Sequence, residues 1–435
     1  MVKPGYKQTE VGIIPNTWQV ISLQNLCIQN GIVRGPFGGA LKKEIFVAEG
    51  YKVYEQGNAI YKTVTRGSYY INATKYNKML RFSVQEGDFI VSCSGTIGMI
   101  FQIPINAPKG IINQALLKLT INDAVVNPQY FYLYFSCDSF TRRIVDDTQG
   151  GAMKNLVGMD VFRNTPFPIP PMPEQKNISI ALADITDLIA NLEAIIAKKK
   201  AIKQGTMQEL LTGKKRLPGF IREWQHFIFG ELFNFIPNNA FTRAQMSESG
   251  KVKNIHYGDI LTKYGAYVNG SSDSIPYISK DVDLARFADR CYLQSGDIIM
   301  ADTAEDETAG KVLEVVNVDC PILAGQHTLL CRPKVRFAPK FLGYYLNAAC
   351  YHDQLIPYIV GTKVSSVSKA SVAQTELVVP DYEEQQAIAE ILSNMDSGIE
   401  ALERKLAKYR QVKQGMMQQL LTGKIRLTKN EEGLE

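Results

Sequence analysis

The chain has 435 residues, of which 45% are hydrophobic, and its net charge is only +5. This length predicts two to three domains, and the small net charge excludes a histone-like polycation, so any binding of a polyanion depends on local patches. The seven cysteines contain no CxxC pair and the four histidines lack metal-ligand spacing, so we expect no disulfide framework, metal or cofactor. We expect a cytoplasmic protein, because no apolar run is long enough to span a membrane and the first residues lack a signal-peptide pattern.

Residues 1–172 are predicted to form a first globular domain of mixed α/β structure. Trp18 is expected to pack an entry strand. The stretch at residues 31–43, GIVRGPFGGALKK, is rich in glycine and flanked by basic residues, which predicts an exposed loop. The aromatic run at residues 128–143 predicts a buried helix.

The strands of this domain are predicted from β-branched and alternating patterns. Residues 89–93 and 97–103 are expected to be strands joined across Ser94, Gly95 and Thr96. Residues 110–119 are a further strand candidate.

Residues 173–217 are predicted to form a long spacer helix. Its apolar side chains step by four and three residues in turn, a 3.5-residue period typical of a coiled-coil seam. The seam consists of Ile178, Leu182, Ile185, Ile189, Leu192 and Ile196.

Residues 218–380 are predicted to repeat the plan of the first domain. Trp224 takes the place of Trp18, SGDIIMADT corresponds to EGDFIVSCSGT, and AGQHTLLCRP corresponds to GIINQALLKL. Residues 257–268 are expected to form a strand and a glycine turn. The scaffold recurs while the loops differ, as in one fold that recognises two different ligands.

Residues 381–427 are predicted to form a second spacer helix, before a short tail at 428–435. Its seam is Ile388, Leu392, Met395, Ile399, Leu402 and Leu406. The sequence KQGMMQQLLTGKIRL from Lys413 is identical to KQGTMQELLTGKKRL from Lys203 at twelve of fifteen positions, with an offset of 210 residues. Such an offset marks an internal repeat. Thr212-Gly213 and Thr422-Gly423 are predicted to end the two helices.

Two equal seams predict that the helices pack on each other. Charge favours an antiparallel pair, because the second helix starts with acidic residues and the first ends with the lysines at 198–200 and 203. The helix dipole accounts for the same charges without pairing. The predicted fold class is α+β, with two mixed α/β domains separated by an antiparallel two-helix coiled coil and related by a pseudo-two-fold.

The whole chain resembles the DNA-specificity subunits of Type I restriction–modification systems. The resemblance is carried by KQTEVGIIPNTWQV, GPFGGALKK, GDFIVSCSGTIG, PPMPEQKNISIALADITDLI and the twin LLTGK-x-RL endings. It implies two target recognition domains that each bind half of a bipartite site in double-stranded DNA. It also implies assembly with two modification (methyltransferase) subunits and, in the full complex, with restriction subunits.

Candidate DNA contacts lie in the basic and divergent loops, since phosphate contacts provide affinity and base contacts provide specificity. For each single residue, a solvated surface role is an equal alternative. The candidates are Arg34, Gly35, Phe37, Gly38, Lys42, Lys43, Ser94, Thr96, Lys154, Lys263, Tyr264, Tyr267, Lys280, Thr303, Lys363, Ser365 and Ser366.

No motif for chemistry is present in the sequence. It contains neither an Asn/Asp-Pro-Pro-aromatic tetrad nor a GxxxxGK[ST] loop, and the acidic run at 301–311 fits an exposed loop. We therefore expect no catalytic residue. Two other classes remain open: a self-sufficient methyltransferase or nuclease with diverged motifs, and a coiled-coil scaffold that does not bind DNA.

Overall fold

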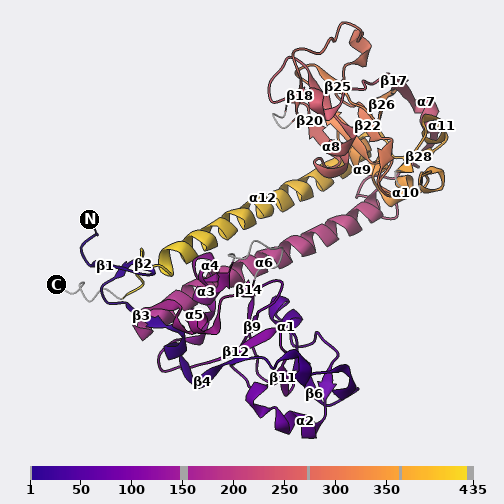
Figure 1. Ribbon diagram of the computed structural model, residues 1–435. Coiled ribbons are helices and arrows are strands. Elements are labelled where there is room, and N and C mark those ends of the chain that lie inside the picture. The colour runs from indigo at the N-terminus through magenta and orange to yellow at the C-terminus, as the bar shows by residue number, and fades with distance from the viewer. Residues whose placement is uncertain (1, 147–154, 272–274, 362–364, 429–435) are drawn as a thin grey trace. The chain divides into compact units, whose positions relative to one another are not determined.

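The computed structural model describes residues 2–146, 155–271, 275–361 and 365–428 (Figure 1). It divides into two units. Unit 1 consists of Met1–Asn191 with Leu406–Glu435, and unit 2 consists of Leu192–Lys405. The two long helices, α6 (Met172–Leu210) and α12 (Tyr382–Leu420), therefore contribute residues to both units.

Unit 1 contains two larger sheets. The first is antiparallel throughout, with the strand order β10-β9-β12-β4, and the second has the order β5-β7-β6-β11-β8, in which β6 and β11 are parallel. The strands of the first sheet are β4 (Cys27–Arg34), β9 (Phe89–Ser92), β10 (Ile100–Gln102) and β12 (Leu116–Ile121). Those of the second are β5 (Phe46–Val47), β6 (Tyr51–Tyr54), β7 (Tyr70–Ile71), β8 (Ser83–Val84) and β11 (Gly110–Ile112).

Short strand pairs and helices complete unit 1. The pairs are β1 (Tyr6–Thr9) with β2 (Gly12–Pro15), β3 (Gln19–Ser22) with β15 (Pro166–Ile169), and β13 (Val145–Asp146) with β14 (Asn155–Leu156). The helices are α1 (Gln56–Ile60), α2 (Ala73–Lys78), α3 (Pro128–Phe135), α4 (Asp138–Ile144) and α5 (Met159–Asn164).

Unit 2 repeats this plan. Its larger sheet has the order β17-β26-β22-β24-β20 and its smaller sheet the order β18-β21-β19-β25, in which β19 and β25 are parallel as β6 and β11 are in unit 1. The strands of the larger sheet are β17 (Phe233–Ile236), β20 (Tyr267–Asn269), β22 (Ile298–Ala301), β24 (Val312–Val316) and β26 (Thr328–Pro333). Those of the smaller sheet are β18 (Met246–Ser247), β19 (Lys253–Ile255), β21 (Tyr277–Ile278) and β25 (Ile322–Ala324).

Most of the remaining elements of unit 2 have counterparts in unit 1, but the pair of β23 with β27 has none among the described strand pairs of unit 1. Strand β16 (Gln225–Ile228) pairs with β28 (Glu376–Val379) as β3 pairs with β15, and β23 (Thr303–Ala304) pairs with β27 (Ser365–Ser366). The helices are α7 (Phe229–Leu232), α8 (Tyr257–Thr262), α9 (Phe341–Leu346), α10 (Ala349–His352) and α11 (Lys369–Ala373). The predicted internal repeat and the predicted mixed α/β character of both domains are confirmed.

Buried ion pairs repeat along with the strands. Asp88 precedes β9 and pairs with Lys118 of β12 at 3.7 Å, while Asp297 precedes β22 and pairs with Arg332 of β26 at 2.7 Å. Both carboxylates also accept a hydrogen bond from a backbone N–H three residues earlier in the chain. A buried charge needs such partners, so this polar feature of the fold is duplicated together with the apolar core.

The long helices extend from the hydrophobic cores of the units. In unit 1, Ile178 and Leu182 of α6 share a core with Leu420 and Leu421 at the end of α12. In unit 2, Ile388 and Leu392 of α12 share a core with Leu210 and Leu211 at the end of α6. Of the twelve predicted seam residues, nine are buried, and Ile189, Met395 and Leu402 are half-buried.

The ion pairs of unit 2 give the direction of the helices. Lys200 pairs with Glu403 at 2.7 Å, and Lys203 pairs with Asp396 at 2.5 Å. The residue number of the partner in α12 falls from 403 to 396 as the residue number in α6 rises from 200 to 203, so the helices are antiparallel. In unit 1 the same direction is seen where Asn177 donates to the carbonyl of Leu427.

Several local predictions were wrong. Residues 257–268 form helix α8 followed by strand β20, because the His256 side chain caps Gly258 N–H and starts a helical turn. The single helix predicted at 128–143 is two helices, α3 and α4, separated at Ser136 and Cys137, and the strand predicted at 110–119 is two strands, β11 and β12.

The predicted helix ends also differ from the structure. Helices α6 and α12 end at Leu210 and Leu420, before the predicted Thr-Gly pairs. Gly213 and Gly423 lie three residues later in the turns that follow, with φ of +68° and +70°, a conformation that favours glycine.

Candidate functional site

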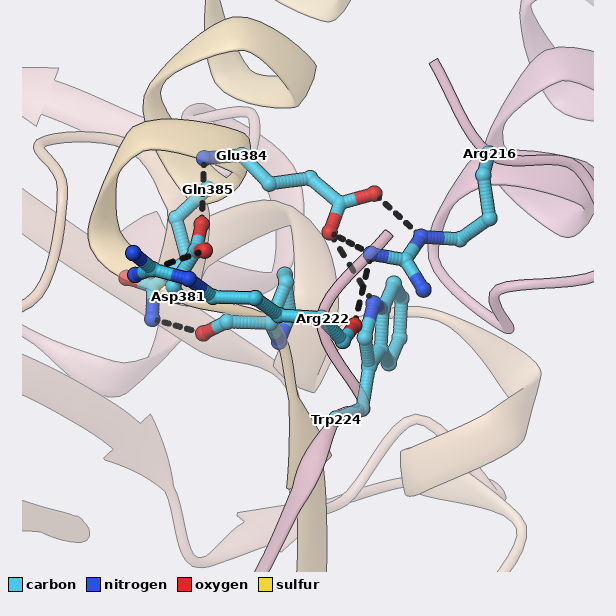
Figure 2. Close-up of polar contacts among 7 residues, drawn as sticks. Arg216, Arg222, Trp224, Asp381, Glu384 and Gln385 are labelled. Carbon is cyan, nitrogen blue, oxygen red and sulfur yellow. Dashed lines mark hydrogen bonds and ion pairs between the residues drawn. The ribbon is translucent and has the colours of Figure 1, made fainter. Parts of the chain in front are cut away.

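A buried carboxylate joins the start of α12 to the chain that follows α6 (Figure 2). The Glu384 side chain is only 1% exposed. It accepts hydrogen bonds from Nε and Nη2 of Arg216, both at 2.6 Å, and from Nε1 of Trp224 at 3.1 Å. The hydrogen bond with Glu384 raises the pKa of Arg216, so the guanidinium stays charged.

Unit 1 contains the same arrangement with the roles of the helices exchanged. Glu174, at the start of α6, accepts from Nε and Nη2 of Arg426 at 2.6 and 2.7 Å and from Nε1 of Trp18 at 3.0 Å. We call each set a clasp: Glu174, Arg426 and Trp18 in unit 1, and Glu384, Arg216 and Trp224 in unit 2. The arginine of each LLTGK-x-RL ending thus pairs with the helix start of the other repeat copy.

The glutamine after each clasp carboxylate fixes the helix to its own domain. Gln175 accepts from the backbone N–H of Asn127 at 2.7 Å and donates to the carbonyl of Pro170 at 2.9 Å. Gln385 accepts from Ala338 N–H at 3.0 Å and donates to the carbonyl of Pro380 at 2.9 Å. The repeated Glu-Gln pair therefore orients each long helix on the sheet domain beside it.

The candidate DNA loop of unit 1 begins where β4 ends. Arg34 is exposed. Gly35 is buried, and a Cβ there would lie 1.8 Å from the carbonyl oxygen of Asn113, so this position requires glycine for packing. Phe37 is 94% exposed, and Gly38 begins a short 3-10 helix, Gly38–Ala40. Lys42 and Lys43 are exposed in the turn that follows.

The structure brings Arg34 close to the predicted β9–β10 tip. On opposite sides of β12, Arg34 is paired with Leu117 and Ser92 with Leu116, so the ends of β4 and β9 lie at the same edge of the sheet with β12 between them. Ser94 and Thr96 are exposed at the tip, which is held by a hydrogen bond from Ser92 Oγ to the carbonyl of Thr96. Burial raises the pKa of the adjacent Cys93 to about 11, while the charge of Arg34 lowers it.

The candidates of unit 2 are more dispersed. Lys263 is exposed at the end of α8, with its Nζ 5.2 Å from the ring centroid of the half-buried Tyr264. Tyr267 packs edge-on against Tyr344 with ring centroids 6.0 Å apart, and Lys340 lies over its ring, so this side chain faces α9. Lys280 is exposed in the turn after β21.

Three other candidates of unit 2 lie together. Thr303 of β23 is directly opposite Ser366 of β27, and Ser365 is opposite Ala304. Thr303 donates to Asp302 at 2.7 Å, and His327 Nδ1 lies 3.7 Å from the same carboxylate. Lys154 and Lys363 are outside the described residues.

A family model matches the chain twice, over residues 15–203 and 221–409, and its description is the Type I restriction modification DNA specificity domain. The two matches cover most of the chain. The chain belongs to this family.

Relatives of this specificity-domain chain cover most of its length. It is 26% identical over 361 residues to the Type I restriction enzyme MjaVIII specificity subunit of Methanocaldococcus jannaschii, which covers 79% of this chain and 80% of that protein. It is 22% identical over 445 residues to the putative type I restriction enzyme MjaX specificity subunit of the same organism, with 97% of each chain covered.

Solved structures share the fold. The S subunit of a Type I restriction-modification system from M. genitalium superposes with a TM-score of 0.51 at 13% identity, covering 93% of this chain and 96% of that one. The HsdS subunit from Thermoanaerobacter tengcongensis gives a TM-score of 0.51 at 16% identity, covering 98% of this chain and all of that one.

The clasps of this specificity-domain chain were not predicted from the sequence. Each joins residues that are 168 or 252 positions apart. The signal was nevertheless present, because both the arginine and the glutamate recur at the 210-residue offset. A second unpredicted feature is the exposed Tyr61, with the guanidinium carbon of Arg66 3.8 Å from its ring centroid, a cation–π contact within unit 1.

The residues that the structure describes contain neither a candidate metal-binding cluster nor a candidate membrane-spanning helix. No cluster of three or more histidine, cysteine, aspartate or glutamate side chains suitable for a metal ion occurs in these parts of the chain. No helix within the same residues has the length and apolar character needed to cross a membrane.

Proposed function

We propose that this chain is the sequence-specific DNA-binding subunit of a Type I restriction–modification complex and acts in the cytoplasm. Residues 1–172 form one target recognition domain and residues 218–380 the other. Each domain binds one half of a bipartite site in double-stranded DNA. The chain itself carries out no catalysis, and methyl transfer and cleavage are performed by partner subunits.

The observation that carries this proposal is the double match to a DNA specificity domain, with most of one copy in each structural unit. The two copies share the order of four strands in each of the two sheets, and they share buried ion pairs, but the loops that end their strands differ. Bases are distinguished by side chains that contact the base edges in the grooves, so different loops on one scaffold suit two different half-sites.

In unit 1, the proposed contact surface includes Arg34, Phe37, Lys42 and Lys43 together with the Ser94–Thr96 tip. Guanidinium and ammonium groups suit phosphates and guanine edges. Phe37 is almost fully exposed, so its ring is available for apolar contact with DNA.

In unit 2, the proposed contacts are Lys263, Lys280, Thr303, Ser365 and Ser366. Lys154 and Lys363, which lie outside the described residues, are also proposed as contacts. Gly35 and Gly38 shape the loop of unit 1. Tyr264 and Tyr267 support their loop from the inside, since both are half-buried.

The long helices are proposed to set the gap between the half-sites. Each has 39 residues, which corresponds to about 58 Å at 1.5 Å per residue. The clasps and the adjacent glutamines fix each helix end to a recognition domain. A change in helix length should therefore change the gap between the half-sites.

Two modification subunits are proposed as partners, with restriction subunits added in the full complex. A solved structure from work on complex assembly and conformational transition of the type I R-M system superposes on this chain with a TM-score of 0.56 at 15% identity. It covers 95% of this chain and 99% of that one.

The experiment that tests the function is a map of methylated bases in cells that contain this protein and its modification subunit. The expected result is one split motif whose two halves are separated by a fixed gap. Methylation at a continuous motif, or none that depends on this protein, would contradict the proposal. Methyl transfer by the purified chain alone would contradict its non-catalytic role.

A further inference from the structure

A short 3-10 helix precedes an edge strand in each unit. In unit 1 it is Lys43–Ile45 and leads into β5, and in unit 2 it is Arg243–Gln245 and leads into β18. The first residue of this helix is exposed and basic in both units. Arg243 therefore occupies the place in unit 2 that the candidate DNA contact Lys43 occupies in unit 1.

The helices that follow β6 and β19 carry a second pair of equivalent residues. The third residue is Asn58 in α1 and Asp259 in α8, and both side chains are buried. Asn58 accepts from Glu55 N–H at 2.8 Å, and its amide donates to two backbone carbonyls of the loop after α1, also at 2.8 Å. Asp259 instead accepts from Nη2 of Arg243 at 2.9 Å. The same position thus stabilises its own loop in unit 1 and holds an arginine in unit 2.

The pair of Arg243 with Asp259 is buried on one side and open on the other. The Asp259 side chain is 7% exposed and the Arg243 side chain is 56% exposed. The second carboxylate oxygen of Asp259, Oδ2, is buried and has no hydrogen-bond partner among the residues that the structure describes. A carboxylate in this state is less favourable than a fully bonded amide. Folding therefore does not account for an aspartate where unit 1 has an asparagine.

The start of α8 keeps Arg243 and Asp259 together. His256 Nδ1 accepts from Gly258 N–H at 3.3 Å, and a Cβ at Gly258 would lie 3.2 Å from Nη2 of Arg243. Burial lowers the pKa of His256 and the charge of Arg243 lowers it further, so the imidazole stays neutral at neutral pH and keeps its acceptor. The guanidinium is therefore held against the first turn of α8.

Helix α8 also contacts the other candidate residues of unit 2. Tyr257 packs edge-on against His327 with ring centroids 5.4 Å apart, and Nδ1 of His327 lies 3.5 Å from Oγ of Thr303. In unit 1, α1 lies against the β9–β10 tip in the same way, since a Cβ at Gly95 would be 3.8 Å from Nε2 of Gln56. Both units thus place a basic residue, a short helix and a strand end in one neighbourhood.

We propose that Arg243 recognises a guanine in the half-site of unit 2 and that Asp259 is the positioning residue that holds its guanidinium. This inference rests on the proposed function and adds to it one base of the target and the side chain that specifies it.

The chemistry of the pair favours a base over a phosphate. In the major groove guanine presents two acceptors, N7 and O6, which match two N–H groups of an arginine, and the bond to Asp259 occupies only one of the five N–H groups of Arg243. Asp259 and the exposed Glu248 line the same pocket of about 440 Å³ as Arg243. Their charges repel a phosphate more strongly than a neutral base edge. An arginine that is already held also loses less side-chain entropy on binding.

The test measures the affinity of the complex with the modification subunit for DNA duplexes that carry the mapped motif. Each base pair in the half-site of unit 2 is replaced in turn; this half is the one that persists when residues 20–165 are exchanged. The variants are Arg243→Ala, Asp259→Asn and both together, and the double variant leaves no unpaired carboxylate behind. The matched control is Arg336→Ala, which removes an exposed arginine of unit 2 that lies over the ring of Tyr382.

The unaltered complex should lose affinity by about 5- to 150-fold when one particular G·C pair of this half-site is replaced. Arg243→Ala and the double variant should bind both duplexes alike, while discrimination in the other half-site and in the control is unchanged. Asp259→Asn should lower discrimination at the same pair but raise the affinity for non-cognate DNA, because the charge of Arg243 is no longer neutralised. A merely structural role of Asp259 would lower both affinities.

Several results would overturn the inference while the proposed function stands. They are a half-site of unit 2 without a G·C pair, full discrimination by the double variant, and an equal loss in Arg336→Ala. Uniform weakening on all duplexes by the double variant, with a salt slope smaller by about one, would show a phosphate contact instead. If the unaltered complex binds all duplexes alike, the proposed function itself fails, and the inference fails with it.

Discussion

The clasp of unit 2 provides a quantitative test of how the long helices are fixed. Replacing Arg216 with methionine leaves the Glu384 carboxylate buried with only the Trp224 N–H as a partner from the clasp. Removing one member of a fully buried ion pair costs about 3–5 kcal/mol. The Arg216 side chain is 27% exposed, so we expect a somewhat smaller loss, about 2–4 kcal/mol of local unfolding free energy.

The same site offers a matched control. Arg222 pairs with Asp381 at 3.5 Å, but its side chain is 78% exposed, and such surface pairs contribute about 1 kcal/mol or less. Arg222→Met should therefore have a small effect. Arg426→Met removes the equivalent clasp residue of unit 1 and should cost as much as Arg216→Met.

Native-state hydrogen exchange measures these losses segment by segment, which suits a protein of two units. Arg216→Met should reduce protection at the start of α12 and the end of α6, and Arg426→Met at the start of α6 and the end of α12. The reasoning is refuted if Arg216→Met costs no more than Arg222→Met, or if both clasp variants expose the same segments.

Four shorter predictions follow. Inserting seven residues into both long helices preserves the seam and adds about 10 Å, so the mapped gap should widen by about three base pairs with both half-sites unchanged. Replacing residues 20–165 with another recognition domain should alter one half of the methylated motif, and a change in both halves would contradict modular recognition. Arg34→Ala should weaken DNA binding by the assembled complex; if Arg34 contacts a phosphate, the slope of affinity against salt falls by about one, and if it contacts a base, only cognate DNA is affected. Burial raises the pKa of Glu314 from 4.5 to about 7, so the native state keeps a proton that the unfolded chain releases. The free energy of unfolding should therefore fall by about 3 kcal/mol as the pH rises from 4.5 to 7. Denaturant titrations measure this dependence, and Glu314→Gln should flatten it.

The parts of the fold that could be predicted from sequence have strong local patterns. The seam of each long helix repeats over six apolar positions, and the 210-residue offset identifies the duplication without any structural information. Short elements lack such signals. Helix α8 has only six residues, and its sequence YGDILT fits a strand or a helical turn equally well until His256 is seen to cap it.

The candidate site could be predicted only in part. Loop composition located Arg34 and Phe37 on exposed positions, but it could not show that Gly35 faces the carbonyl of Asn113, a contact between segments distant in sequence. Tyr267 was predicted beside a glycine turn, and its packing against Tyr344 depends on how α9 meets β20. Such contacts depend on the tertiary structure, and local patterns in a single sequence do not predict them.

The division of the two units along the chain affects the order of folding. All of unit 2 is one continuous stretch, Leu192–Lys405, whereas unit 1 also needs Leu406–Glu435. Leu420 and Leu421 fill the core of unit 1, and Arg426 neutralises its buried Glu174. During synthesis the domain that is translated first therefore lacks part of its core until these later residues emerge. Unit 1, whose first residues are translated first, is therefore expected to complete its folding after unit 2.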